Sequence, residues 1–261
     1  MKEIKILNKN YDKPISCLTA YSPSIANILD GKIDLILVGD SLGSTLYGMK
    51  NTQGVTMEMM KNHGAVVNKV IKKSLKVLDM PYKTYENKKD AFKNAKILLN
   101  YCKPDLLKLE INKKKLIILK HLVSKKINII SHIGVTPQSY KDFNKIKILG
   151  KTNIEKNNLL KLAKESEKLG AKAILLECIT ADTAKLITES ISIPTIGIGA
   201  SKYCDGQVLV FDDLINLSLN NKKPKFVKNY LNFNKIAGNA VKKYNQDVKL
   251  KKFPSLEFTY N

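Results

Sequence analysis

Short apolar runs alternate with longer amphipathic stretches from about residue 15 to about residue 215 of this 261-residue chain. Short apolar runs bounded by turn residues are typical of buried strands, and amphipathic stretches of ten or more residues are typical of helices. Strands that alternate with helices pair as a parallel sheet. Eight strands are predicted, the number that closes a (β/α)8 TIM-type barrel: 15–20, 34–40, 75–79, 106–110, 127–132, 173–177, 194–198 and 207–211.

The stretches between the strands predict the helices. The segment 56–73 carries apolar residues on one rough stripe, as an amphipathic helix does. Beyond the barrel, 224–261 predicts one or two C-terminal helices followed by an irregular end, packed on the outside or on a neighbouring subunit. The predicted helices of the barrel are 22–30, 56–73, 88–102, 111–125, 153–169 and 181–190.

Length and composition predict a single α/β domain, 1–261, with 224–261 as its peripheral tail. A chain of this size buries enough surface to fold without disulfides. Its amino terminus has lysines but no following apolar core, which argues against a secretory signal. The cysteines are far apart in the sequence and form no CxxC motif. We therefore expect reduced thiols and a cytoplasmic location.

The chain carries a formal net charge of +22, from 45 Lys and Arg residues against 23 Asp and Glu. Every one of these cations is Lys, whereas Arg is the residue that binds phosphates and guanine bidentately. The lysines are also spread along the whole chain. A lysine-coated enzyme surface, whose positive field would attract anionic substrates, is favoured over a lysine-rich barrel that binds polyanions such as nucleic acid.

Five apolar runs end on a side chain that can do chemistry. Because the carboxyl ends of barrel strands meet at one rim, these side chains are expected to lie close together in an active site. For a single acid, a helix cap or a surface position would be the simpler interpretation, but five at strand ends favour a site. The five residues are Asp40, Asp79, Glu110, His132 and Glu177.

Side chains alternate along a strand, so the fourth strand can be divided into two faces. Lys108 and Glu110 share one face, and Leu107 and Leu109 share the other, where they would meet the outer helices. The lysine is therefore predicted to point to the same side as the acid.

Asp40, Asp79 and Glu110 at one rim would repel each other. Two carboxylates 4 Å apart repel by about 4 kcal/mol at an effective dielectric constant near 20. A bound divalent cation would remove this repulsion, and ligands that offer only oxygen favour Mg²⁺. Such a cation can chelate a 2-oxo acid and stabilise the enolate that forms when the neighbouring carbon loses a proton.

The remaining residues then have expected roles. Lys108 would balance the substrate carboxylate, and Glu177, outside the metal cluster, is free to be the base. For His132, a hydrogen bond to the substrate is favoured by its position at the rim over a purely structural role. Ser41, in a tight glycine turn, can donate to a bound anion. The glycine-rich loop 197–206 is interpreted equally well as a phosphate-binding loop or as ordinary turn glycines.

Long sequence runs, in a fixed order over nearly the whole chain, resemble one known family, ketopantoate hydroxymethyltransferase (3-methyl-2-oxobutanoate hydroxymethyltransferase). The matching runs are LTAY at 18–21, VGDSLG at 38–43, Val55-Thr56 with His63, DMP at 79–81, KLE at 108–110, HIGVTPQS at 132–139, LLEC at 175–178, IPTIGIGA at 193–200, CDGQVLV at 204–210 and PKFVK at 224–228.

The resemblance implies a barrel enzyme that moves a one-carbon unit from 5,10-methylenetetrahydrofolate to 3-methyl-2-oxobutanoate. The product is 2-dehydropantoate, for pantothenate biosynthesis. It implies one Mg²⁺ per subunit, the folate as co-substrate, and a homo-oligomer, often a decamer. It also implies that Glu177 removes the C3 proton, that the metal is held directly or through water by Asp40, Asp79 and Glu110, and that the oxo acid is held by Asp40, Ser41, Asp79 and Lys108, with His132 lining the pocket.

The chain departs from the family pattern in its loops. Gln53-Gly54 stands where the family has Leu-Pro, and Ser131 replaces a glycine before His132. Ile111-Asn112 and the segment 143–145 also replace glycine turns. These changes affect loop geometry more than the reaction type. The alternative within the enzyme class is another Mg²⁺-dependent, enolate-forming barrel of the phosphoenolpyruvate mutase and lyase type.

Overall fold

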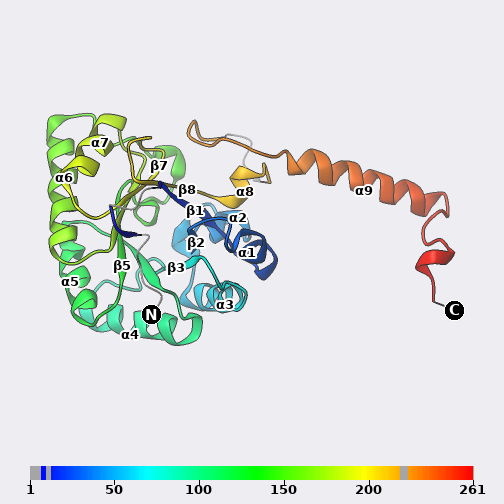
Figure 1. The fold of residues 1–261 in the computed structure, drawn as a ribbon, viewed down its shortest axis with the longest axis horizontal. Helices are drawn as coiled ribbons and strands as arrows, with labels where there is room; N and C mark the ends of the chain where they lie inside the picture. The colour runs from blue at the N-terminus through cyan, green and yellow to red at the C-terminus, as the bar shows by residue number, and fades with distance from the viewer. Residues whose placement is uncertain (1–6, 10–12, 218–222, 261) are drawn as a thin grey trace. The chain divides into compact units, whose positions relative to one another are not determined.

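The computed structural model describes residues 7–9, 13–217 and 223–260. It divides into two compact units, residues 1–210 and residues 211–261. In the first unit, the described residues form a closed barrel of parallel strands in the order of the sequence, surrounded by helices (Figure 1). Its strands are β1 (Ile15–Thr19), β2 (Leu35–Val38), β3 (Leu75–Asp79), β4 (Leu106–Glu110), β5 (Ile129–Gly134), β6 (Ala173–Glu177), β7 (Thr195–Ile198) and β8 (Gly206–Leu209).

Helices follow the strands from β1 to β6, as the sequence predicts, and a loop leads from β7 to β8. Each predicted strand and barrel helix has a counterpart, and most ends shift by at most two residues, but the predicted helix 111–125 begins only at Leu116, after a 3₁₀ turn, and the helix 56–73 ends at Asn68. Short elements in the loops were not predicted. The helices of this unit are α1 (Pro23–Leu29), α2 (Leu42–Thr45), α3 (Met57–Asn68), α4 (Lys88–Cys102), α5 (Leu116–Ser124), α6 (Asn153–Lys168) and α7 (Ala181–Ser190), with 3₁₀ turns η2 (Thr52–Gly54), η3 (Lys113–Lys115), η4 (Pro137–Ser139) and η5 (Phe143–Lys145).

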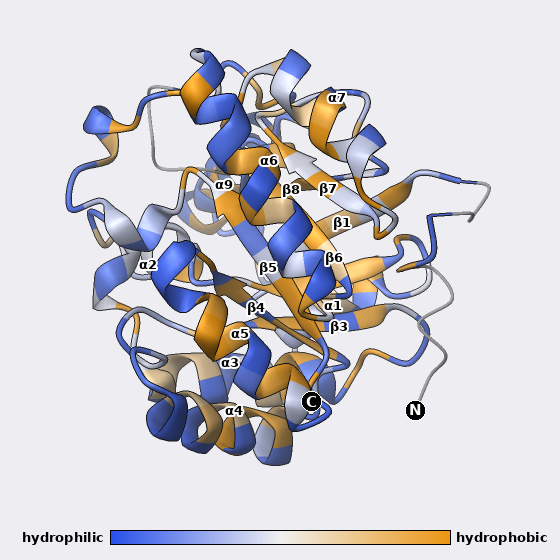
Figure 2. Ribbon diagram, turned by 90° about the vertical axis from the view of Figure 1, so that its left-hand side faces the viewer, coloured by the Kyte–Doolittle hydropathy of each residue, from blue (hydrophilic) through white to orange (hydrophobic). Residues whose placement is uncertain are grey.

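Apolar side chains fill the barrel between its strands. The strands are strongly hydrophobic, whereas the helices carry hydrophobic and hydrophilic residues on different faces (Figure 2). Alternate residues of each strand point into the barrel, as in Leu75 and Val77 of β3. Burial of this apolar surface is the main stabilising contribution to the fold. The interior cluster is Leu7, Ile15, Cys17, Leu35, Leu37, Leu75, Val77, Leu106, Ile130, Ala173, Leu175, Ile196 and Val208.

Side-chain caps begin several of the helices. Thr152 and Glu155 form a capping box at the start of α6, in which the side chain of each residue accepts a hydrogen bond from the backbone N–H of the other. The side chains of Thr56 and Asn87 accept N–H groups at the starts of α3 and α4. Such caps satisfy donors that the helix itself leaves unpaired.

The helix predicted over 56–73 is shorter in the structure, where α3 ends at Asn68. The carboxylate of Asp30 accepts the backbone N–H groups of Lys72, Lys73 and Ser74 at 2.8–3.2 Å. These bonds draw the segment out of the helix and lead it into β3. The predicted helix was too long because the apolar residues of its stripe continue beyond Asn68, whereas the contacts with Asp30 depend on a residue far away in the sequence.

Two strand ends also differ from the prediction, and both carry site residues. β2 ends at Val38, so Asp40 lies in the following turn and not in the strand. β5 begins at Ile129 and continues to Gly134, so His132 lies inside the strand and not at its end. Ile127 belongs to the turn that follows α5, where its N–H bonds to the carbonyl of Leu122.

The second unit contains α8 (Phe211–Leu214), α9 (Phe233–Lys249) and a 3₁₀ turn, η6 (Leu256–Phe258). The predicted C-terminal helix and irregular end are present. Several large apolar side chains of this unit are exposed, among them Ile236, Val241 and Tyr244. How the tail packs remains a prediction. None of the helices in the described ranges is long and apolar enough to cross a membrane.

Candidate active site

The polar residues of the barrel interior follow the apolar ones at the carboxyl ends of the strands. Strand pairing aligns Asp79 with Lys108, and Glu110 with His132. Lys108 and Glu110 continue the inward alternation that Leu106 begins on β4. All four polar residues are buried. The parity prediction for β4 thus agrees with the register, and these side chains gather at one rim.

A tight turn after β2 brings Asp40 to the same rim. The turn is closed by hydrogen bonds from the N–H groups of Leu42 and Gly43 to the carbonyls of Gly39 and Asp40. The backbone N–H of Asp40 donates to Oδ2 of Asp79 at 3.0 Å. The two predicted metal ligands are therefore linked directly, although Asp40 does not belong to the strand.

Ser41 lies next in this turn and is half-buried. Its hydroxyl is 2.7 Å from the hydroxyl of Tyr21, which follows β1. Gly39 keeps the turn narrow, because a Cβ at this position would lie 3.0 Å from the Ser41 Oγ and 3.4 Å from the Asp79 Oδ2. The serine hydroxyl is thus held beside the acids, where it could donate a hydrogen bond to a bound anion.

Lys108 is the lysine of this cluster, and its Nζ lies 2.9 Å from Oδ1 of Asp79. Burial raises the pKa of Asp79 to about 7, since it and the charge of Asp40 outweigh the opposing effect of Lys108. Burial alone would lower the pKa of Lys108, but the neighbouring carboxylates outweigh burial and raise it above its usual value. The lysine is therefore a permanent cation in a cluster richer in acids than in bases.

Glu110 is buried among these groups. Burial first, and then the charge of Asp40, raise the pKa of Glu110 well above its usual value. Its Oε1 accepts the backbone N–H of Gln138 at 3.1 Å. A second positive charge close to the acids would stabilise their ionised forms.

His132 lies between the lysine and Glu177. Its Nδ1 is 3.4 Å from Nζ of Lys108, and its Nε2 is 3.2 Å from Oε2 of Glu177. An ammonium can only donate, so Nδ1 is the accepting nitrogen and Nε2 carries the proton that faces the carboxylate. Burial and the charge of Lys108 lower the pKa of His132, which keeps the ring neutral.

Glu177 ends β6 and differs from the other acids in its access. Its side chain is 19% exposed, against 5% for Glu110 and 2% for Asp79. Gly134 allows β5 to approach it closely. It has a φ of +99°, and a Cβ there would collide with the carbonyl oxygen of Glu177. This carboxylate is thus the acid of the rim that a substrate can reach most easily.

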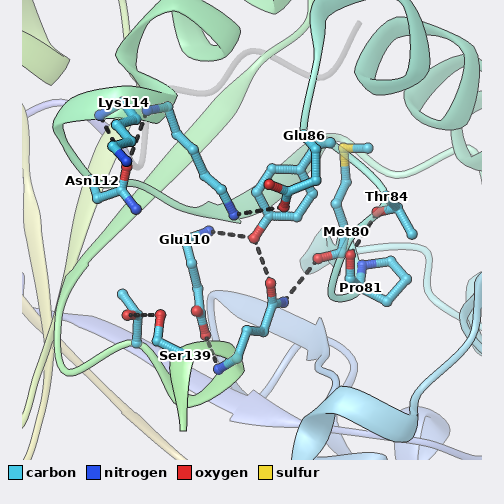
Figure 3. A network of polar contacts seen from close by, with 12 residues as sticks. Met80, Pro81, Thr84, Glu86, Glu110, Asn112, Lys114 and Ser139 are labelled. Carbon is cyan, nitrogen blue, oxygen red and sulfur yellow. Dashed lines mark hydrogen bonds and ion pairs between the residues drawn. The ribbon is translucent and has the colours of Figure 1, made fainter.

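Two residues of the site were not predicted from the sequence. The hydroxyl of Tyr85 donates to Oε1 of Gln138 at 2.5 Å, and Nε2 of Gln138 donates to Oδ2 of Asp40 at 2.8 Å. Figure 3 shows the surroundings of this network, with Met80 and Glu110 labelled. Gln138 lies within the HIGVTPQS run, which was the available signal, but nothing in that run indicates that its amide reaches the loops after β2 and β3.

The donor set of the rim fits a hard divalent cation. Asp40, Asp79, Glu110 and Glu177 place four carboxylates around the single ammonium of Lys108 and a neutral imidazole. Among the described residues, however, no group of three or more His, Cys, Asp or Glu side chains forms a ready-made metal cage. The acids therefore fit a metal by charge and oxygen chemistry, with water completing its coordination, as Mg²⁺ usually requires.

Known proteins match this chain over nearly its whole length. Residues 2–256 match the family model described as ketopantoate hydroxymethyltransferase. A relative from Pelagibacter ubique, named 3-methyl-2-oxobutanoate hydroxymethyltransferase, is 48% identical over 98% of this chain and 99% of its own length. A relative of the same name from Rhizobium rhizogenes is 41% identical over 95% of this chain and 91% of its own.

Solved structures support the barrel. A 2,3-dimethylmalate lyase of the PEP mutase/isocitrate lyase superfamily superimposes with a TM-score of 0.61 at 11% identity, covering 97% of this chain and 85% of that one. Phosphonopyruvate hydrolase gives a TM-score of 0.60 at 10% identity, covering 94% and 88%. At such low identity these structures establish only the fold. The family model and the curated relatives go further, and they show that the chain belongs to the ketopantoate hydroxymethyltransferase family.

Proposed function

We propose that this protein transfers a hydroxymethyl group from 5,10-methylenetetrahydrofolate to 3-methyl-2-oxobutanoate. The product is 2-dehydropantoate, a precursor of pantothenate. The names of the curated relatives support the acceptor. The observation that carries the proposal is the separate placement of Glu177, beside His132 and accessible to a substrate, next to the buried acids on β3 and β4.

In this proposal Asp40, Asp79 and Glu110 hold one Mg²⁺, directly or through water. The bound cation supplies positive charge that makes the hydrogen on C3, next to the keto group, more acidic. It also compensates carboxylates whose burial would otherwise be unfavourable. The residues themselves contribute the oxygen ligands and the dry surroundings.

Lys108 and Ser41 bind the oxo acid in this proposal. Lys108 now pairs with Asp79, and a cation beside that acid would let the ammonium interact with the substrate carboxylate as well. The hydroxyl of Ser41 donates a second hydrogen bond, and Tyr21 holds it in place. These contacts would orient the substrate so that its C3 hydrogen faces Glu177.

Glu177 acts as the general base. Its carboxylate removes the C3 proton, and Nε2 of His132 lies beside it, 3.2 Å from its Oε2. C3 then forms a carbon–carbon bond to the methylene carbon of the folate, the two carbon–nitrogen bonds that hold this carbon break, water supplies the hydroxyl oxygen of the product, and tetrahydrofolate leaves. The exposed side of Glu177 is where the folate would have to approach, because the other acids are buried.

Proton exchange tests this proposal without the folate. The wild-type protein, incubated with Mg²⁺ and 3-methyl-2-oxobutanoate in heavy water, is expected to replace the C3 hydrogen with deuterium, as NMR would show. Chelation of the metal is expected to stop the exchange. Added 5,10-methylenetetrahydrofolate is expected to yield 2-dehydropantoate. Exchange with no folate-dependent product would favour an enolate-forming lyase or mutase, and no exchange would contradict the proposal.

The oligomeric state forms part of the proposal. We propose a homo-oligomer, most simply the decamer that the family resemblance implies. Light scattering is then expected to give a mass about tenfold that of the 29.3 kDa chain. A monomeric mass would contradict this part and leave the proposed reaction untouched.

A further inference from the structure

The side-chain amide of Gln138 lies at the centre of a buried network that joins three strand ends. Its Nε2 donates to Oδ2 of Asp40 at 2.8 Å and to the carbonyl of Met80 at 3.0 Å. Its Oε1 accepts the hydroxyl of Tyr85 at 2.5 Å. The side chain is almost fully buried. Figure 3 shows the bond to the Met80 carbonyl.

The orientation of this amide is determined by its partners. A carboxylate and a carbonyl can only accept hydrogen bonds, so the NH₂ group must face Asp40 and Met80. The Tyr85 hydroxyl accepts the backbone N–H of Glu110 at 3.3 Å, which leaves its own hydrogen for the Gln138 oxygen. A flipped amide would place oxygen against oxygen at two contacts. Each polar atom of the amide therefore has a suitable partner.

The backbone of Gln138 holds a second acid. Its N–H donates to Oε1 of Glu110 at 3.1 Å. One residue thus binds two of the three acids that we assign to the metal, Asp40 with its side chain and Glu110 with its main chain. Asp40 comes from the turn after β2 and Glu110 from the end of β4, and their mutual repulsion would otherwise drive them apart.

We propose that Gln138 is a positioning residue for the cation site. By tying one oxygen of Asp40 and one of Glu110, it fixes the direction in which each carboxylate presents its other oxygen to the cation. This inference rests on the proposed function, since it assumes that the acids bind a divalent ion. Partners of this kind, one shell behind the ligands, change metal affinity about 10- to 100-fold when they are removed.

Gln53 supplies a matched control, because its side chain holds the loop that contains Gln138 and, among the described residues, donates to no acid of the rim. Its Nε2 donates to the backbone carbonyl of Gln138 at 2.9 Å, and Asn51 makes a similar bond to the carbonyl of Lys141 at 2.8 Å. Gln53 therefore anchors the same loop through the same kind of amide. It differs in that this bond goes to the Gln138 main chain and not to a carboxylate.

The test is Mn²⁺ binding to the full-length protein without substrate, measured by calorimetry and by the EPR signal of free Mn²⁺. Gln138→Met keeps the side-chain volume and the backbone N–H but removes the amide. It is expected to weaken Mn²⁺ binding at least tenfold, whereas Gln53→Met is expected to stay within about twofold of the wild type. Circular dichroism checks that both variants are folded.

Tyr85→Phe provides a second route if Gln138→Met does not fold. It removes the hydroxyl that orients the amide and is expected to weaken Mn²⁺ binding about threefold. Binding within error of the wild type in Tyr85→Phe alone would count against the inference, and where Gln138→Met is folded, adding Tyr85→Phe to it should weaken binding no further, because the amide that the hydroxyl orients is gone. Additive losses would indicate two independent effects and would overturn the proposed linkage.

The outcomes separate this inference from the proposed function. If the wild-type protein fails to bind Mn²⁺, the metal assignment itself is wrong. If the wild type binds Mn²⁺ and Gln138→Met binds it within twofold, Gln138 does not position the ligands. Equal losses in Gln138→Met and Gln53→Met would show that only the anchoring of the loop matters, which also overturns the inference.

Discussion

The inside of the barrel has two regions that use the same strands for opposite purposes. On β4, Leu106 lies in the apolar cluster, while Lys108 and Glu110 lie two and four residues further along the same face. All three are buried to a similar degree. The apolar cluster that contains Leu106 is stabilised by the burial of hydrophobic surface. The rim at the carboxyl ends of the strands instead contains charged side chains, whose burial is unfavourable.

This difference shows where the molecule places function above stability. An apolar side chain at the rim would be favourable for folding, since buried ion pairs contribute little net stability. The rim instead keeps four acids, with raised pKa values at Asp79 and Glu110. Changes at the rim should therefore affect ligands and catalysis, and changes below it should affect folding. The following predictions test that division, beginning with the largest expected effect.

Glu177→Gln is expected to lower the rate of C3 proton exchange by about 10²- to 10⁴-fold, because the amide cannot accept the proton. The free energy of unfolding should change little, since this side chain is partly exposed. NMR exchange and urea unfolding measure the two effects. Glu167→Gln, a change at a carboxylate that binds Ser192 outside the rim, is the control and should exchange normally. Normal exchange in Glu177→Gln would refute the assigned base.

Leu106→Ala is expected to lower the free energy of unfolding by about 2–5 kcal/mol, through lost apolar burial and a cavity. Folded protein should still exchange the C3 proton at a rate close to that of the wild type. Glu110→Gln, on the same face of the same strand, should give the reverse pattern, with unfolding little changed and exchange impaired. If both variants lost stability equally, the two regions would not differ as described.

Mg²⁺ is expected to stabilise the wild-type protein by about 2.7 kcal/mol when its concentration is a hundredfold above its dissociation constant. In the proposed site the acids would bind the ion only in the folded protein, where they lie together. Asp79→Asn should lose most of this stabilisation, because it removes one charged ligand. Urea unfolding with and without Mg²⁺ measures the effect. Equal stabilisation of the wild type and of Asp79→Asn by Mg²⁺ would show that the ion binds away from Asp79.

Tyr21→Phe is expected to raise the KM for 3-methyl-2-oxobutanoate about fivefold, equivalent to roughly 1 kcal/mol for one hydrogen bond. The change leaves Ser41 without the hydroxyl that orients it. Tyr47→Phe is the matched control, because its hydroxyl binds His63 at 3.0 Å and not Ser41. Steady-state kinetics would contradict the role of Tyr21 if both variants had the same KM.

Much of the barrel could be predicted because its strands are short apolar runs between clear turns. β3, β4 and β6 have the predicted bounds, and the alternation on β4 placed Lys108 and Glu110 on the inner face. Carboxyl ends of parallel strands share a rim in any such barrel, so the meeting of Asp79 and Lys108 followed from topology. The family resemblance supplied the reaction.

The parts that could not be predicted depend on contacts between distant segments. Asp30 ends α3 by binding backbone groups of the segment before β3, and no local pattern reveals this. Gln138 and Tyr85 lie in loops, where neither apolar periodicity nor strand parity indicates a direction. Their roles emerge only when the loops after β3 and β5 close over the same rim.

A crystal structure with Mg²⁺ and 3-methyl-2-oxobutanoate bound would test the central claim most directly, namely that the acids of the rim assemble one cation and one keto acid beside a base. We expect the ion to contact Asp40, Asp79 or Glu110, directly or through water, and the substrate's C3 to lie within reach of Glu177. An ion or a substrate bound away from this rim, or a C3 turned away from Glu177, would contradict the account.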